Sequence, residues 1–112
     1  VSTYPGKDID QTLKLIKILR KKYKIKIGYS DHTRGNISSI IATSLGAEVL
    51  EKHFTINPKL KGRDNKFAIT PKMLTRLVDY RNNFYNMMKP KGLNVQACEM
   101  DIFKNYRGRW SK

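Results

Sequence analysis

The sequence predicts an α/β fold that forms the C-terminal portion, about three βα units, of a (β/α)8 TIM barrel. Short apolar runs alternate with helix-length amphipathic segments, and this order makes the strands parallel. Three parallel strands cannot bury both of their faces alone. A complete barrel takes about 250 residues, so a chain of 112 residues would supply only its last units. The expected strands are 1–4, 24–29 and 47–54, and the expected helices are 8–22, 37–45 and 71–89.

Each helix is predicted by a periodic apolar stripe and by its end signals. The first carries Ile9, Leu13 and Ile16 on one side and ends in a cationic turn, as a helix C-terminus favours. The second is expected to have Asn36 as its N-cap, a largely apolar face, and Gly46 in the left-handed conformation at its end.

The third helix has the clearest start signal, because the Thr70 hydroxyl can cap it and Pro71 suits its first position. The side chains expected on its buried face are Leu74, Leu77, Val78, Phe84 and Met87 or Met88. A long polar loop, 55–69, precedes it at the sheet edge where loops are often functional.

We expect residues 1–89 to belong to the barrel domain and 90–112 to be an extension towards a possible second domain. The chain begins with Val1 rather than Met, and its first residues resemble the end of a strand. We therefore expect it to be a fragment.

The composition excludes some classes of protein. No apolar run is long enough for a transmembrane helix, and one cysteine fits a reducing cytosol, so we expect a cytoplasmic protein. The net charge of +14 invites a nucleic-acid interpretation. However, the lysines are spread over every expected element, so we do not expect nucleic acid as a partner. An anionic small substrate suits the same charge, and a non-catalytic basic binding module stays an alternative.

The two histidines of the chain, His32 and His53, each follow an apolar run. Since parallel strands end at one edge of a sheet, both should lie at that edge. Alternation along a strand puts Ser30 on the face of His32 and Glu51 on the face of His53. Two imidazoles with nearby oxygen atoms suit Mn, Fe, Co or Zn. The alternative is two unrelated loop histidines.

Four motifs together resemble the sialic acid synthase family, which includes N-acetylneuraminate synthase and the synthases of legionaminic and pseudaminic acids. They are Ser-Thr-Tyr-Pro at 2–5, Gly-Tyr-Ser-Asp-His-Thr at 28–33, Gly-Ala-Glu-Val-Leu-Glu-Lys-His-Phe-Thr at 46–55 and Gly-Arg-Asp at 62–64. The resemblance implies a condensation of phosphoenolpyruvate with an N-acylated amino sugar, such as N-acetylmannosamine, to a nine-carbon 2-keto acid.

The resemblance also implies roles for single residues. His32 and His53 would bind the catalytic metal, most often Mn2+, with Mg2+ or Co2+ possible. Ser30 would contact the phosphate of phosphoenolpyruvate, as would Ser2, where the family often has Asn. Tyr4 and Asp64 would contact the sugar, and Glu51 would order a water or the enolpyruvate.

From the residues alone, several of these side chains have simpler explanations. Ser30 could cap the turn at Thr33 or Gly35, Glu51 could be a buried partner of Lys52 or of a neighbouring strand, and Asp64 could be a solvated loop carboxylate. We expect Asp31 to be either a loop carboxylate or a carboxylate behind the metal ligands that orients an imidazole.

In the family, a sugar-binding glutamate and a phosphate-binding lysine come from earlier strands, and the full-length protein is a homodimer. The expected partner of this chain is therefore the missing N-terminal half of the barrel, and we expect the isolated chain to be inactive. A legionaminic or pseudaminic acid synthase remains as an alternative within the same chemistry.

Overall fold

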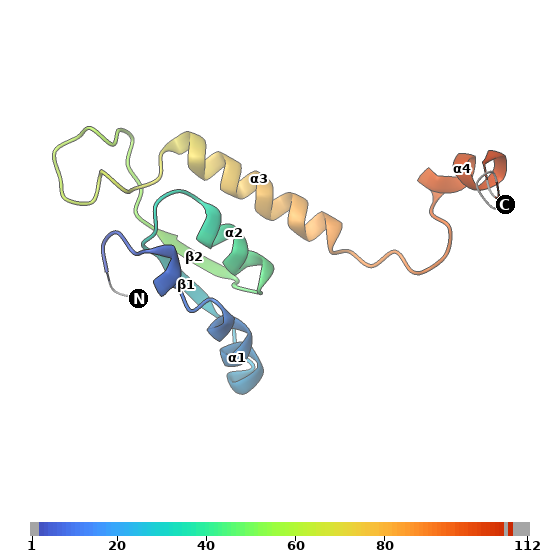
Figure 1. The fold of residues 1–112 in the computed structure, drawn as a ribbon, viewed down its shortest axis with the longest axis horizontal. Coiled ribbons are helices and arrows are strands. Elements are labelled where there is room, and N and C mark those ends of the chain that lie inside the picture. The colour runs from blue at the N-terminus through green and yellow to red at the C-terminus, as the bar shows by residue number, and fades with distance from the viewer. Residues whose placement is uncertain (1–2, 107, 109–112) are drawn as a thin grey trace.

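The computed structural model describes residues 3–106 and 108 and shows a small α/β body with a long extension (Figure 1). A 3-10 turn and one helix precede a first strand, a second helix and a second strand, and a long helix leads to the extension. The elements are η1 (Asp8–Asp10), α1 (Lys14–Tyr23), β1 (Gly28–Asp31), α2 (Ile37–Ser44), β2 (Val49–Lys52), α3 (Pro71–Met87), η2 (Ala97–Glu99) and α4 (Met100–Asn105).

The strands β1 and β2 pair in parallel, as the strand–helix–strand order predicts. Gly28 pairs with Val49 and Asp31 with Lys52. Both strands are shorter than expected, and β1 begins four residues later than the expected 24. The Lys-Ile alternation before Gly28 imitates a half-buried strand, but Ile25 is 61% exposed and lies outside the sheet. At the other end of β2, Phe54 forms an isolated parallel bridge with Ile69.

The expected first strand is absent from the residues that the structure describes. Thr3 and Tyr4 are irregular, and Val1 and Ser2 lie outside the described part. The segment still runs beside the end of β1, because the Gly6 amide donates to the His32 carbonyl at 2.8 Å. One such bond is too little pairing to make a strand, so the described sheet has two strands instead of three.

The first helix was predicted too long at its N-terminus. Residues 8–10 form a 3-10 turn, and Gln11 then takes an extended conformation that ends it. The Gln11 side chain accepts a hydrogen bond from the Tyr29 hydroxyl at 2.8 Å. This contact holds Gln11 against β1, and α1 starts three residues later, at Lys14. Its one buried side chain, Ile16, joins Ile27, Ala42 and Ala47 in the small core.

The helix α2 buries its small residues instead of its isoleucines. Ser39 and Ala42 are fully buried, whereas Ile37 is 66% and Ile41 44% exposed. Small side chains let the helix lie close to β1, and the expected apolar face therefore points outwards. Asn36 is the N-cap residue as predicted, but its side chain makes no capping bond and its amide donates to the Met73 carbonyl of α3 instead. Gly46 does end the turn, with a φ of +98°.

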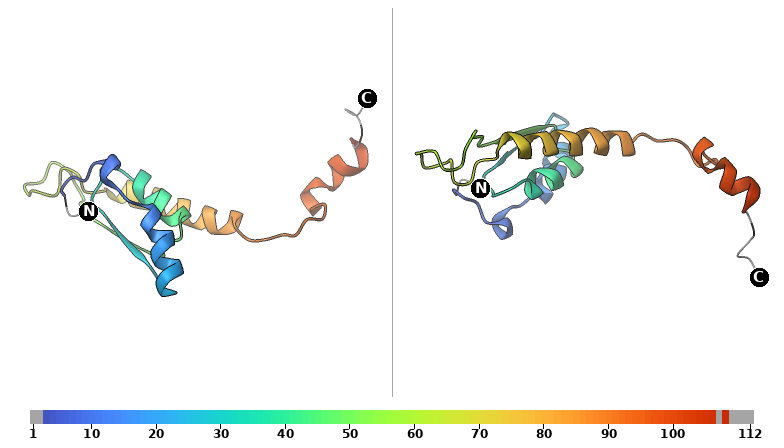
Figure 2. Two further views of the ribbon diagram at one scale, coloured as in Figure 1. Left: turned by 60° about the horizontal axis from the view of Figure 1, so that its bottom comes forward. Right: turned by 90° about the horizontal axis from the view of Figure 1, so that it is seen from above.

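The start of α3 is confirmed: the Thr70 hydroxyl accepts from the Met73 amide, and Pro71 is the first helical residue. The helix ends at Met87, before Pro90 as predicted. Its buried face is smaller than expected, because Leu77 is buried while Leu74, Val78 and Met87 are exposed. Figures 1 and 2 show α3 lying along α2 on one side of the sheet.

The extension leaves the body after α3 and carries α4 well away from it (Figure 2). The Cα radius of gyration is 19.8 Å, whereas a compact domain of this length would have about 13 Å. The short helix α4 was not predicted, and residues 107 and 109–112 of the expected extension lie outside the described part. In the described part of the chain, no helix is both long and apolar enough to cross a bilayer.

Candidate functional site

Continuing the β1–β2 register by one residue brings His32 beside His53, just beyond the last paired residues Asp31 and Lys52. The backbone of each histidine is held in place. The His32 carbonyl accepts from the Gly6 amide, and the His53 carbonyl accepts from the Ile69 amide, both at 2.8 Å. The predicted placement of both histidines at the carboxyl edge of the sheet is therefore confirmed, and their shared role stays a prediction.

Aromatic rings surround the two imidazoles. The Tyr4 ring stacks on His32 with centroids 4.2 Å apart and meets His53 edge-on at 5.4 Å. The His32 and His53 centroids are 5.7 Å apart. Phe67, from the end of the long loop, lies edge-on against His53 at 5.3 Å. An open pocket of about 240 Å³ is lined by Tyr4, His32, Glu51, Lys52 and His53.

Ser30 and Glu51 occupy paired positions on the two strands and bond to each other. The Ser30 hydroxyl donates to Glu51 Oε2 at 2.5 Å, and both residues are exposed. Ser30 is therefore not a turn serine, and Glu51 is not the buried partner of Lys52. The pair lies on the same face as the two histidines, next to them along the strands, as alternation predicted.

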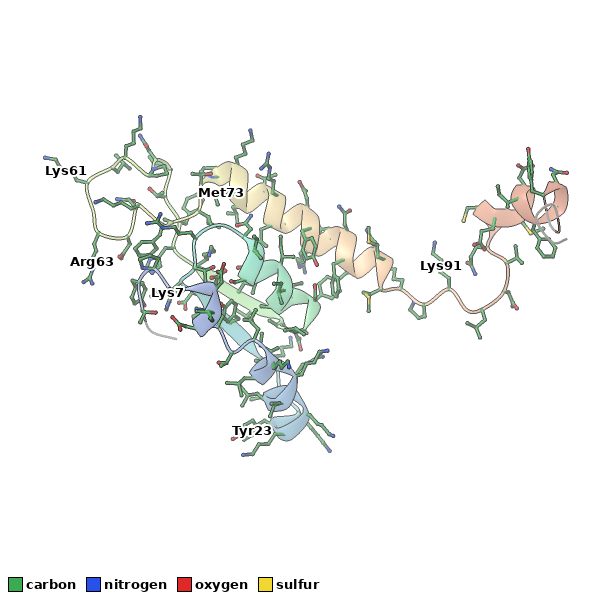
Figure 3. The ribbon with its side chains drawn as sticks, viewed as in Figure 1. Lys7, Tyr23, Lys61, Arg63, Met73 and Lys91 are labelled. Atoms are coloured by element: carbon green, nitrogen blue, oxygen red, sulfur yellow. The ribbon has the colours of Figure 1, made fainter. Side chains whose placement is uncertain are left out.

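Of the two predicted sugar-side residues, Tyr4 lines the pocket and Asp64 lies beside it, next to His53. Asp64 Oδ2 is 3.8 Å from His53 Nδ1, which is longer than a hydrogen bond, and its side chain is half-exposed. The Asp64 carbonyl accepts from the Phe67 and Ala68 amides, so this turn carries Asp64 towards the histidines. Nearby on the same loop, Lys61 and Arg63 point outwards (Figure 3). Ser2 lies outside the described residues.

Behind the site is a buried polar cluster that sequence reasoning missed. Asp31 is 1% exposed and accepts from the Thr33 amide and hydroxyl, both at 2.8 Å, and from the Ser39 hydroxyl at 2.5 Å. Lys52 Nζ is 2.9 Å from Asp31 Oδ2 and donates to the Thr33 carbonyl at 2.7 Å. Asp31 is thus a strand residue and not a loop carboxylate. The sequence did contain a signal for this cluster. An acidic and a basic residue, Asp31 and Lys52, stand at positions that pair between the two strands on the face covered by helices.

Burial alone would raise the pKa of Asp31, but the hydrogen bonds from Ser39, Lys52 and Thr33 outweigh it and hold that pKa below its usual value of 3.8. Because the folded-state pKa is the lower one, this carboxylate adds stability above pH 4 to 5, and that stability is lost as the pH falls through the folded pKa.

We therefore expect the free energy of unfolding to fall as the pH drops below 3.8 towards the lower folded-state pKa of Asp31. Urea unfolding followed by circular dichroism at several pH values measures this. The double variant Asp31→Asn with Lys52→Met, which has no titrating carboxylate at position 31 and leaves no ammonium buried, should show a flatter decline, and an equally steep decline in that variant would contradict the assignment to Asp31.

The two imidazoles are the candidate metal donors of this site. Among residues 3–106 and 108, no group of three or more His, Cys, Asp or Glu is arranged to hold an ion. Two imidazoles on one ion cannot have ring centres more than about 6.5 Å apart, because a metal–nitrogen bond is about 2.1 Å. The observed 5.7 Å meets this limit. The Tyr4 ring stacks on one face of the His32 ring. The pair fits a two-histidine site with the remaining positions open.

Comparison with known proteins places these features in a family. N,N'-diacetyllegionaminic acid synthase of Campylobacter jejuni is 42% identical over 74 residues, which cover 66% of this chain and 22% of that protein. N-acetylneuraminate-9-phosphate synthase of Drosophila melanogaster is 40% identical over 85 residues, 75% of this chain and 23% of that protein. The chain thus spans less than a quarter of the length of these relatives.

A solved structure gives the same result for the fold. The N-acetylneuraminic acid synthetase of Leptospira borgpetersenii, solved with citrate, superposes with a TM-score of 0.78 at 36% identity and covers 93% of this chain and 36% of its own. A sequence model of the NeuB family matches residues 1–92. The strand ends that carry His32 and His53 therefore lie in a mixed α/β fold that this chain shares with sialic acid synthases. The chain belongs to the NeuB family.

Proposed function

We propose that this chain is the C-terminal part of a synthase barrel that condenses phosphoenolpyruvate with an N-acylated amino-sugar aldehyde. The observation that carries the proposal is the convergence of His32 and His53 at the carboxyl edge of a parallel sheet. Membership of the NeuB family, whose named relatives are synthases of nine-carbon acidic sugars, supports it. The rest of such a barrel would cover the histidine-bearing face of the sheet, on which Val49 is 57% exposed.

In the proposed reaction, a carbon–carbon bond forms between the methylene carbon of phosphoenolpyruvate and the aldehyde carbon of the sugar. Water adds to the enol carbon, and phosphate leaves. His32 and His53 would hold a divalent metal, Mn2+ first and Mg2+ or Co2+ as alternatives. When bound, such an ion acts as a Lewis acid on a carbonyl oxygen.

The side chains of this chain would bind and orient the reactants. Ser30 would donate to the phosphate in exchange for its present bond to Glu51. Glu51 would then be free to accept a proton from a water that it orders near the enol carbon. Tyr4, stacked on His32, closes one side of the pocket and would border the sugar. Asp64 at the rim would accept a hydrogen bond from it.

The proposal has several closely related versions, which differ in the sugar that the enzyme uses. The relatives include synthases of legionaminic, pseudaminic and N-acetylneuraminic-type acids at similar identity, from 37% to 42%. The substrate difference would lie on the long loop around Asp64. A homodimer in the cytoplasm is the setting that we propose for the complete enzyme.

The metal part of the proposal is tested by thermal unfolding of the chain with and without Mn2+. We expect Mn2+ at 100 times its dissociation constant to stabilise the folded state by about 2.7 kcal/mol. His32→Ala and His53→Ala should each abolish the shift, since one imidazole cannot hold the ion alone. Cys98→Ala removes the exposed thiol of the extension and should keep the full shift.

A basic binding module would behave differently in the same preparation. Such a module would bind polyanions with a steep salt dependence, and its binding would be unchanged by His32→Ala. A missing Mn2+ shift in the unsubstituted chain, together with that behaviour, would overturn the synthase proposal.

A further inference from the structure

We propose that the buried Asp31–Lys52 pair positions the two histidines by fixing the register of β1 against β2. This inference rests on the proposed function, in which the histidines act together, and assigns positioning residues to it. The pair joins paired positions of the two strands, directly before His32 and His53 in the sequence.

The bonds of this pair reach both sides of His32. Asp31 precedes His32 and Thr33 follows it, and Lys52 contacts both, through the Asp31 carboxylate at 2.9 Å and the Thr33 carbonyl at 2.7 Å. Lys52 itself immediately precedes His53. A single ammonium group therefore connects the backbone around one histidine to the backbone of the other.

The direction of the side chains separates this pair from the site. Successive strand residues point to opposite faces. Asp31 and Lys52 lie on the helix-covered face, with side chains 0% and 5% exposed. The histidines occupy the other face. The Asp31 carboxylate and the bonds of the Lys52 ammonium therefore lie behind the histidines, although Lys52 also forms part of the pocket lining.

Net stability is a weak reason for such a pair, because replacing a buried ion pair by neutral residues of similar volume is often neutral or stabilising. Geometry is a better reason. A slip of two residues would move one strand by about 6.6 Å against the other and would separate the imidazoles. Apolar neighbours such as Leu50 would permit that slip, whereas an ion pair with one partner on each strand opposes it.

The decisive variant is the double substitution Asp31→Asn with Lys52→Met. The carboxamide introduced at position 31 keeps an oxygen for the Thr33 amide and hydroxyl and supplies an N–H donor for the Ser39 hydroxyl. Only the link between the two strands is lost, and no charge is left buried. A matched control is Arg20→Met with Glu48→Gln, which removes the partly exposed ion pair of 3.7 Å between α1 and the residue before β2.

The first measurement is the nuclear Overhauser contact between the ring protons of His32 and His53, with an Ile16–Ile27 contact as the reference for the core. We expect the histidine contact to weaken at least twofold in the double variant while the reference contact and the midpoint of thermal unfolding are kept. The control pair should leave both contacts unchanged. An unaltered histidine contact in the folded double variant overturns the proposal.

The second measurement is titration with Co2+ alone, followed by its visible absorption. Outer partners of metal ligands typically change metal affinity 10- to 100-fold, and we expect a loss of at least tenfold in the double variant. Absence of Co2+ binding by the unsubstituted chain would count against the proposed metal site only, because the ring contact measures the positioning role without any metal. Equal affinity in both proteins would overturn the positioning role.

Discussion

Asp31→Leu should destabilise the fold by about 3–5 kcal/mol, because it leaves the Lys52 ammonium buried without a partner. The Thr33 amide and the Thr33 and Ser39 hydroxyls would also lose their acceptor. Since the total stability of a natural domain is about 5–15 kcal/mol, we expect a largely unfolded population at 37 °C. Urea unfolding followed by far-ultraviolet circular dichroism measures the effect.

The control for this substitution is Asp79→Leu on α3. Asp79 is exposed, and surface changes away from special features alter stability by about 0.5 kcal/mol or less. A loss of less than 1 kcal/mol in Asp31→Leu, similar to that of the control, would mean that water reaches the cluster and that the pair is not buried in solution.

Ile16→Ala should cost about 2–5 kcal/mol, the range for removing a large buried aliphatic side chain. Ile16 is 5% exposed and belongs to a core whose other buried members are Ile27 and two alanines. So small a core has few other apolar atoms to fill the cavity. The midpoint of thermal unfolding measures the loss.

Ile18→Ala provides a matched comparison in the same helix, because Ile18 is 56% exposed. Alanine has the higher helix propensity, so we expect this variant to be neutral or slightly stabilising. Equal losses at positions 16 and 18 would contradict the described orientation of α1.

The sequence predicted the features that depend on local chemistry. The Thr70–Pro71 start of α3 and the left-handed Gly46 follow from single residues whose conformational preferences are strong. The convergence of the histidines follows from chain order, since a strand–helix–strand unit is parallel. These features need no knowledge of what lies beside the unit.

The sequence could not predict features that depend on a neighbour. The alternation around Ile25 looks like a strand, but a strand also needs a partner to pair with. The isoleucines of α2 suggested its buried face, yet close approach to β1 selects Ser39 and Ala42 instead. The sequence suggested Glu51 as a partner of Lys52, because nothing in the segment around Lys52 shows that Asp31 lies opposite. Pairing across 21 positions decides its role.

The fixed pairing of β1 with β2 limits how the length of the segment between the two histidines can change. Because β1 and β2 pair in fixed register, the interval from His32 to His53 is set by one loop, the two turns of α2 and one return turn. Removing one residue within α2 would rotate the rest of that helix by about 100° and present its wrong side to β1. Length changes are tolerated more readily in loops than within α2, as in the loop 55–69 outside this interval. The spacing of the two histidines should therefore drift much less among descendants of this sequence than the identity of the residues between them.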